Sequence, residues 1–216
     1  APVILDGLGR ELPRLQPELR EMMTDDALDT LNRGRLDAAV IVIDVNLRRT
    51  VVVPMYDEPL VLLIPADHPW AGREDVDPAE LDDQKLLMLD EGNCLRDQTL
   101  ALCQRYGVNP PIAVATTLAT VVGMVTHGAG ATVIPEGALR LLESDGAFAV
   151  ARFAEPGAVR RIGLVHRTSS SRGEDFTRLA EVVTNLARDA NLPMRPLSES
   201  VDLDVGAGRR TRRGRS

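Results

Sequence analysis

Two cysteines, Cys94 and Cys103, are the side chains whose type and spacing in this sequence could do chemistry. Asn93 is a favoured helix N-cap and good helix formers follow it, so we predict a helix over residues 95–106 with Cys94 in its first turn. There the helix dipole and Arg96 favour the thiolate form of Cys94. Three acidic neighbours oppose it: Asp90, Glu91 and Asp97. The local sequence is therefore compatible with a reactive thiol at position 94.

Cys103 follows Cys94 by nine residues, which in one helix is about 13.5 Å along the axis and about half a turn around it. A disulfide needs Cα atoms within about 7 Å, so the two cannot bond while the helix is intact. One interpretation is a two-state switch, in which Cys94 is oxidised to sulfenic acid and Cys103 then attacks it as the segment refolds. The other is two unrelated cysteines, one of them buried as a small hydrophobe. Spacing alone leaves both open.

Other chemistry is sparse in the sequence. The three histidines, at 68, 127 and 166, share no metal-ligand spacing, so we expect no metal site and no cofactor. Serines 169–171 lie in no nucleophile elbow and are assigned to a loop. The chain has no dinucleotide-binding glycine pattern, and glycines 128 and 130 are assigned to a tight turn.

Composition bounds the class of protein. The 216 residues correspond to one or two domains, and 44% hydrophobic content is enough to build a core. No apolar run approaches the ~18 residues that span a bilayer, and no signal peptide opens the chain, so we expect a cytoplasmic protein. The formal charge is −7, and five arginines in residues 206–216 leave the rest of the chain at −12. So acidic a body does not attract nucleic acid through its own field.

Short apolar runs alternate with helical patterns, which predicts an α/β fold with largely parallel sheets. The predicted strands are residues 19–23, 38–43, 60–64, 86–89, 112–115, 131–134 and 162–165. The predicted helices are residues 25–33, 95–106, 118–127, 136–142 and 174–190, and residues 4–12 also have the pattern of a helix. Because the chain begins without methionine and in mid-helix, we expect that an N-terminal portion is missing. From about Pro196 the periodicity is lost, so we predict a disordered basic tail.

The cysteine segment carries a family resemblance. Residues 85–89, then Cys94-Leu95-Arg96-Asp97-Gln98 and Cys103, resemble the regulatory domain of peroxide-sensing LysR-type transcriptional regulators. Further segments match the family in order: residues 31–37, 57–60, 67–71, 124–130 and 160–165. The resemblance covers about residues 1 to 190. The five-residue cysteine motif with its second cysteine is the specific part, whereas several other segments mark LysR-type effector domains in general.

The resemblance implies a two-subdomain fold like type II periplasmic binding proteins, with crossings near Asp57 and Ile162. Subdomain I would comprise residues 1–57 and 163–195, subdomain II residues 58–162 with the redox segment, and residues 196–216 the tail. The family's DNA-binding domain, its linker helix and the first strand of the regulatory domain are expected to lie outside this chain.

For the site, the resemblance implies that Cys94 is the peroxidatic thiol and Cys103 the resolving one. Thr24 matches a threonine that helps to hold peroxide, although by itself it would serve as an N-cap for the helix after it. Three more residues match positions that support the redox segment: Arg96, Asp97 and Arg160. Their alternative role is surface ion pairing. Asn93 stands where many family members have histidine, so any imidazole contribution to the thiolate is absent.

The implied function is a hydrogen peroxide sensor acting through a reversible Cys94–Cys103 disulfide, not an enzyme. Its partners would be hydrogen peroxide, a reductant of the thioredoxin or glutaredoxin type, and further copies in a homodimer or tetramer. Promoter DNA and RNA polymerase would be reached only through the full-length protein, and no membrane is expected. Two alternatives remain: an effector domain that binds a small organic anion, with Thr116 and Thr117 at a helix N-terminus, and a thiol peroxidase.

Overall fold

The computed structural model describes residues 2–43, 47, 49–91, 93–109, 113–142 and 146–198. Its α-helices are α1 (Pro2–Glu11), α2 (Thr24–Asn32), α3 (Cys94–Tyr106), α4 (Leu118–Thr126) and α5 (Gly173–Asp189), and two 3-10 helices are η1 (Pro78–Asp83) and η2 (Glu136–Leu141). Its strands are β1 (Ala38–Val42), β2 (Thr50–Pro65), β3 (Leu86–Leu89), β4 (Ala113–Ala115), β5 (Ala131–Pro135), β6 (Phe148–Arg152) and β7 (Val159–Arg167). None of the helices in these described ranges is long and apolar enough to cross a membrane.

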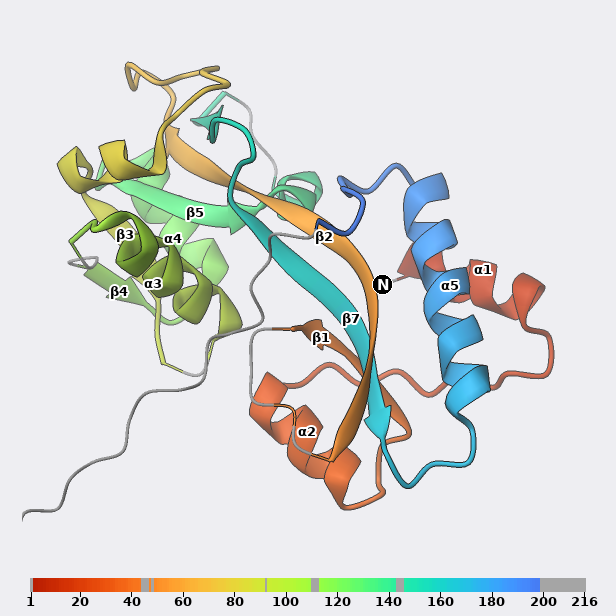
Figure 1. Cartoon of the computed structure of the whole chain (residues 1–216). Helices are drawn as coiled ribbons and strands as arrows, with labels where there is room; N and C mark the ends of the chain where they lie inside the picture. Colours follow the sequence, from red (N-terminus) through yellow and green to blue (C-terminus); the bar gives the residue numbers. More distant parts are fainter. Residues whose placement is uncertain are drawn as a thin grey trace, which may run out of the picture.

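The long strand β2 joins two halves of the molecule. Its first part, from Thr50 to Pro59, pairs antiparallel with β7, which pairs on its other side with β1. Its second part, from Leu60 to Pro65, lies between β5 and β6. Figure 1 shows β2 and β7 running side by side from the half with α1, α2 and α5 toward the half with α3 and α4. The fold is the mixed α/β, two-part arrangement that the sequence predicted.

Most predicted elements lie where the sequence placed them, including the helix at the start of the chain and the turn with positive φ at Gly128. The strand predicted at residues 19–23 is wrong: the segment has no strand structure, and Leu19 is 62% exposed. The helix predicted at 136–142 is the 3-10 helix η2.

The prediction of largely parallel sheets is also wrong. Among the described strands, β3 pairs in parallel with β4 and β5, whereas every pairing of β2 and β7 is antiparallel. The alternation of strands and helices in the sequence does not record strand direction. Strand β2 runs from the first half of the molecule to the second and β7 runs back, so the two pair in antiparallel direction.

The chain passes from one sheet to the other at two places. Along β2 the passage lies between Pro59 and Leu60, and the returning chain joins the β1–β7–β2 sheet at Val159, against predictions near 57 and 162. Ser198, which we assigned to the tail, is hydrogen-bonded to the side chain of Asp57. Residues 199–216, with all five tail arginines, lie outside the described residues.

The larger hydrophobic core lies around β3, β5 and the second part of β2, and α3 and α4 pack on it. Helix α3 contributes Leu95, Leu102 and Cys103 to this core. Two smaller clusters lie on opposite faces of the β1–β7–β2 sheet, because neighbouring residues of a strand point to opposite faces. Leu164 packs with Phe176 of α5, and Val165 packs with Leu31 of α2. The cysteine helix is thus anchored in the main core.

A buried ion pair marks the junction of β2 and β7. Both side-chain oxygens of Asp57, which is 1% exposed, accept hydrogen bonds from Arg161, at 2.8 and 3.0 Å. The Ser198 backbone N–H and hydroxyl each donate to the same carboxylate at 2.9 Å. The backbone of Asp57 also exchanges two hydrogen bonds with that of Arg195. Asp57 therefore holds β2, β7 and the segment after α5 together.

The hydrogen bonds at this junction decide the ionisation of Asp57. Burial by itself would raise the pKa of the Asp57 carboxyl, but the hydrogen bonds from Arg161 and Ser198 outweigh burial and lower that pKa. The folded chain therefore binds the Asp57 carboxylate in its charged form, and folding is linked to pH through this group.

We predict that Asp57→Asn lowers the free energy of unfolding by about 3 kcal/mol near neutral pH, because it leaves the Arg161 guanidinium buried without its counter-charge. The wild-type ion pair contributes fully above the unfolded-state pKa of about 3.9 and is lost as the pH falls through the lower folded-state pKa. The difference in stability should therefore shrink below about pH 4 in urea titrations. In the exposed ion pair of Asp29 with Arg33, Asp29→Asn should change stability by less than about 0.5 kcal/mol. Equal effects of the two changes would contradict the prediction.

Candidate functional site

Helix α3 begins and ends with well-formed caps. The Asn93 side chain accepts a hydrogen bond from the Leu95 backbone N–H at 3.0 Å, which confirms the predicted N-cap. At the other end Gly107 has a left-handed backbone with φ of 71°, and its N–H donates to the carbonyl of Cys103. The Val108 N–H donates to the same carbonyl at 2.8 Å. The helix therefore includes both cysteines, with Cys94 in its first turn as predicted.

The two thiols occupy different surroundings. Cys94 is partly buried, whereas Cys103 is 2% exposed and belongs to the main core. Burial raises the pKa of the Cys103 thiol, although a backbone hydrogen bond acts weakly in the other direction. Neither cysteine is in a disulfide. Helix geometry puts about 13.5 Å of axial rise between them, so the reduced arrangement keeps the thiols apart.

The other residues of the motif surround the first turn of α3. The Arg96 guanidinium contacts the end of β3, with Nη1 3.4 Å from the sulfur of Met88 and 3.5 Å from the carbonyl oxygen of Leu89. Its Nη2 lies 3.9 Å from the carboxylate of Glu91. Asp97 is exposed. Arg96 thus joins the start of α3 to the end of β3. Its contacts are therefore not limited to a surface ion pair.

Gln98 is a residue of this site that the sequence did not single out. It lies one helical turn after Cys94 and is only 8% exposed, on the buried face of α3. Among the described residues, neither its amide nitrogen nor its amide oxygen has a hydrogen-bond partner. Buried amides are normally paired, so both a donor and an acceptor remain available next to the cysteine turn. The sequence signal was a polar residue at a helix position where the three- and four-residue spacing of Leu95 and Leu102 calls for an apolar one.

Two predicted site residues come from other elements. Thr24 is the first residue of α2, which packs against β1 and β7. The N-cap of α2 is Met23, so the expectation that Thr24 is the N-cap is wrong. Arg160, near the start of β7, pairs with Glu58 of β2 at 2.7 and 2.8 Å, and both side chains are largely buried. Arg160 thus belongs to the β2–β7 junction.

Of the two threonines considered for an anion site, Thr117 caps a helix. Thr117 is the N-cap of α4, and its hydroxyl oxygen accepts from the Thr120 N–H at 3.2 Å and contacts the Thr120 hydroxyl at 2.9 Å. A groove of about 810 Å³ lies elsewhere, between α5 and the neighbouring ends of β2 and β7, with His166 and Thr177 among its lining residues. None of the predicted site residues lines that groove.

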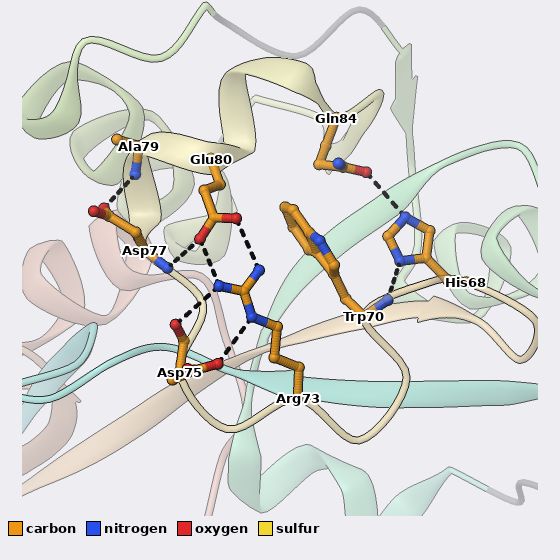
Figure 2. Close-up of polar contacts among 8 residues, drawn as sticks. All are labelled: His68, Trp70, Arg73, Asp75, Asp77, Ala79, Glu80 and Gln84. Carbon is orange, nitrogen blue, oxygen red and sulfur yellow. Dashed lines mark hydrogen bonds and ion pairs between the residues drawn. The ribbon is translucent and has the colours of Figure 1, made fainter.

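The motif at residues 67–71 forms a polar cluster with η1, drawn in Figure 2. The ring of His68 accepts the Trp70 N–H at Nδ1 and therefore donates from Nε2 to the Gln84 side chain, both at 3.1 Å. Arg73 makes two hydrogen bonds to Glu80, at 2.8 and 2.9 Å, and these hold the pKa of the Glu80 carboxyl below its usual range. Each of these bonds joins the loop after β2 to itself or to η1. The cluster therefore has a structural role, and among the described residues no group of three or more potential ligands could hold a metal ion.

Comparison with known families and proteins gives a consistent result. Residues 1–188 match the model of the LysR substrate binding domain. The chain is 41% identical over 187 residues to a probable hydrogen peroxide-inducible genes activator of Mycobacterium avium, covering 86% of this chain and 60% of that relative. It is 36% identical over 183 residues to the transcriptional dual regulator OxyR of Escherichia coli, covering 84% of this chain and 60% of OxyR. The chain thus spans about 60% of the length of these curated relatives.

Solved structures of OxyR proteins match the fold of this chain. A hydrogen peroxide-bound cysteine-to-serine mutant of OxyR from Corynebacterium glutamicum superposes with a TM-score of 0.82 and 35% identity, over 88% of this chain and 61% of that one. The reduced OxyR regulatory domain from Pseudomonas aeruginosa superposes with a TM-score of 0.73 and 31% identity, over 85% of this chain and 90% of that domain. The fold therefore matches that of OxyR regulatory domains.

We predict that a thiol-alkylating reagent at pH 7.5 modifies Cys94 at least about ten-fold faster than Cys103, because Cys103 is buried and its pKa is raised. Peptide mass mapping of the reduced chain over time measures both rates. In urea the difference should fall to less than about three-fold, since unfolding removes the protection of Cys103. Equal rates in the folded chain would contradict the site geometry.

Proposed function

The chain belongs to the LysR substrate-binding domain family, and on that premise we propose that it is the peroxide-sensing regulatory domain of an OxyR-like transcription regulator. The observation that carries the proposal is the pair Cys94 and Cys103, placed at the two ends of one capped helix. The relatives named above are gene regulators rather than enzymes, in agreement with the expectation that the chain is not an enzyme.

The proposed chemistry has two steps. The thiolate of Cys94 attacks one oxygen of hydrogen peroxide, the O–O bond breaks, and the products are a sulfenic acid on Cys94 and hydroxide, which takes up a proton to give water. The sulfur of Cys103 then attacks the sulfenic sulfur, the S–O bond breaks, and a second water leaves as the disulfide forms. A dithiol of the thioredoxin or glutaredoxin type returns both cysteines to thiols by exchange.

The geometry makes the second step a conformational one. The caps at Asn93 and Gly107 and the burial of Cys103 stabilise α3 in the reduced chain. Disulfide closure within about 7 Å requires that part of this helix opens and that Cys103 leaves the core. Oxidation thereby exchanges one packing of residues 94–106 for another, which is the kind of two-state element through which a local reaction can be passed on to a partner domain.

Supporting roles follow from the placement of the side chains. The amide of Gln98, which has no partner among the described residues, offers both a donor and an acceptor, and hydrogen peroxide needs both. Arg96 keeps the first turn of α3 against β3 through its contacts with Met88 and Leu89. Asn93 orders the same turn by capping it and contributes no charge. Thr24 as a further peroxide ligand, and Asp97 and Arg160 as supporting residues, are assigned on the family resemblance.

The wider setting is also part of the proposal. Reversible disulfides of this kind belong to the reducing cytoplasm, where they act as transient redox signals. We assign a homodimer or tetramer to the full-length protein, and contacts with promoter DNA and RNA polymerase to parts of that protein beyond this regulatory domain.

We predict that about one equivalent of hydrogen peroxide converts both thiols of the reduced wild type into one intramolecular Cys94–Cys103 disulfide, with a loss of helical signal in circular dichroism. Thiol counting and mass mapping after a stoichiometric titration test this. Cys94→Ser should leave Cys103 unoxidised, and Cys103→Ser should stop at a sulfenic acid on Cys94 that a dimedone-type reagent traps. Slow oxidation of both thiols without a crosslink would overturn the proposed switch.

Gln98→Met should slow the trapping of sulfenic acid at Cys94 by about three- to ten-fold, because peroxide loses hydrogen-bond partners. The same change should raise the free energy of unfolding by about 1 to 2 kcal/mol, because it removes buried polar groups that have no partner. Gln104→Met, at an exposed position of the same helix, is the matched control and should change neither quantity. An unchanged trapping rate would contradict the role of Gln98 as a peroxide ligand, and an unchanged free energy of unfolding would contradict the burial of an unpaired amide.

A further inference from the structure

The interior of α3 carries a side-chain hydrogen bond in addition to those of its backbone, of the kind that Thr177 and Thr184 make in α5. The Thr99 hydroxyl donates to the carbonyl oxygen of Leu95 at 2.9 Å, and Thr99 is only 2% exposed. In an α-helix that carbonyl is also the acceptor for the Thr99 backbone N–H. Leu95 O therefore has two donors from a single residue. Thr99 lies midway between Cys94 and Cys103, in the stretch that disulfide closure has to open.

A second donor changes the cost of opening that turn. When a helical turn opens inside a protein, its carbonyl loses its N–H partner, and a buried carbonyl without a partner is costly. A hydroxyl on the same residue can keep the hydrogen bond while the backbone moves, and side-chain bonds of this kind compete with the helix. The Leu95–Thr99 turn is thus the part of α3 with an alternative partner already in place.

The remaining bonds of the helix point to the same turn. The carbonyl of Cys103 is held by two backbone N–H groups, from Gly107 and Val108, so the C-terminal end of α3 is anchored without side-chain help. The N-terminal end is held instead by side chains, namely the cap of Asn93 and the contacts of Arg96 with the end of β3. Opening of the helix between the cap and Thr99 would release Cys94, which is partly buried. The core contacts of α3 from Leu102 onward, including those of Cys103, can stay in place until the two sulfurs come together.

We infer that Thr99 is a positioning residue for disulfide closure, because its hydroxyl retains the Leu95 carbonyl as that turn of α3 opens. The inference rests on the proposed function and concerns only its second step, in which the sulfur of Cys103 attacks the sulfenic sulfur of Cys94 and water leaves. Thr99 takes no part in the reaction with peroxide. It sets how readily helix α3 opens once Cys94 has been oxidised to the sulfenic acid.

The test compares Thr99→Val with the wild type. Valine has the shape and nearly the helix propensity of threonine, so the change removes the hydroxyl and little else. After a peroxide pulse, closure of the Cys94–Cys103 disulfide should be slower by about three- to ten-fold, the effect of losing roughly one hydrogen bond in the opening step. Backbone hydrogen exchange of residues 94–106 in the reduced chain should slow by a similar factor. Formation of sulfenic acid, measured in a Cys103→Ser background, should be unchanged.

Two further variants exclude a general effect of repacking. Thr132→Val removes another buried hydroxyl, which donates to the Leu87 carbonyl at 2.9 Å between β5 and β3, and it should alter neither closure nor exchange of α3. Thr99→Ser keeps the hydroxyl and should close at least as fast as the wild type. Wild-type closure rates in Thr99→Val, or an equal slowing in Thr132→Val, would overturn the inference.

The inference and the proposed function can fail separately. Absence of any disulfide in the wild type would remove the proposed function, and with it the role of Thr99 in closure. If the wild type does close its disulfide but hydrogen exchange of the reduced helix is unaffected by Thr99→Val, the proposed function stands and the role of Thr99 falls.

Discussion

The ion pair of Asp57 with Arg161 lies where β2 passes from one sheet toward the other, and much of the fold is built around it. A carboxylate that is 1% exposed cannot remain charged without its guanidinium, so the β2–β7 pairing has one register at this point. Ser198 and the backbone of Arg195 bind to the same aspartate, which also fixes the segment after α5. These contacts hold together the two long strands, β2 and β7, that join the half with α3 to the half with α2 and α5 in Figure 1.

Helix α3 has to be stable in the reduced state and yet open when the disulfide forms. A stable reduced state requires a capped helix with Cys103 packed in the core, and the caps at Asn93 and Gly107 supply it. A disulfide requires that the same helix opens, which a fully apolar face would resist. The buried face of α3 contains Gln98, whose amide has no partner in the described part of the chain, and Thr99, whose hydroxyl is bonded within its own turn. Polar groups at core positions lower the stability of a helix locally, and such departures from local rules are expected where function requires motion.

Much of the fold could be predicted because its signals are local. The strand at 86–89 is a short apolar run, and the helix after it begins at an asparagine cap, so both were placed within a residue or so. The strand predicted at 19–23 and the parallel direction of the sheets failed because pairing depends on distant residues. No local pattern shows that residues 50–59 pair antiparallel with residues 159–167. For the same reason the sequence did not identify Gln98 as a site residue. Whether its amide is buried and paired depends on the segments packed around it, not on its neighbours in the chain.

The sequence by itself determined the chemistry that is available: two cysteines nine residues apart, in a motif that resembles a peroxide-sensing family, within an acidic α/β chain without a predicted metal site. It also determined, through helix geometry, that the thiols cannot meet while their helix is intact. Only the tertiary structure decided that Cys103 is a core residue with a raised pKa and that Arg96 binds the end of β3. The tertiary structure also buries the amide of Gln98 beside the cysteine turn, with no hydrogen-bond partner in the segments that the structure describes. Burial and the pairing of polar groups are set by contacts between segments far apart in the chain, and those contacts exist only once the two sheets have come together around β2 and β7.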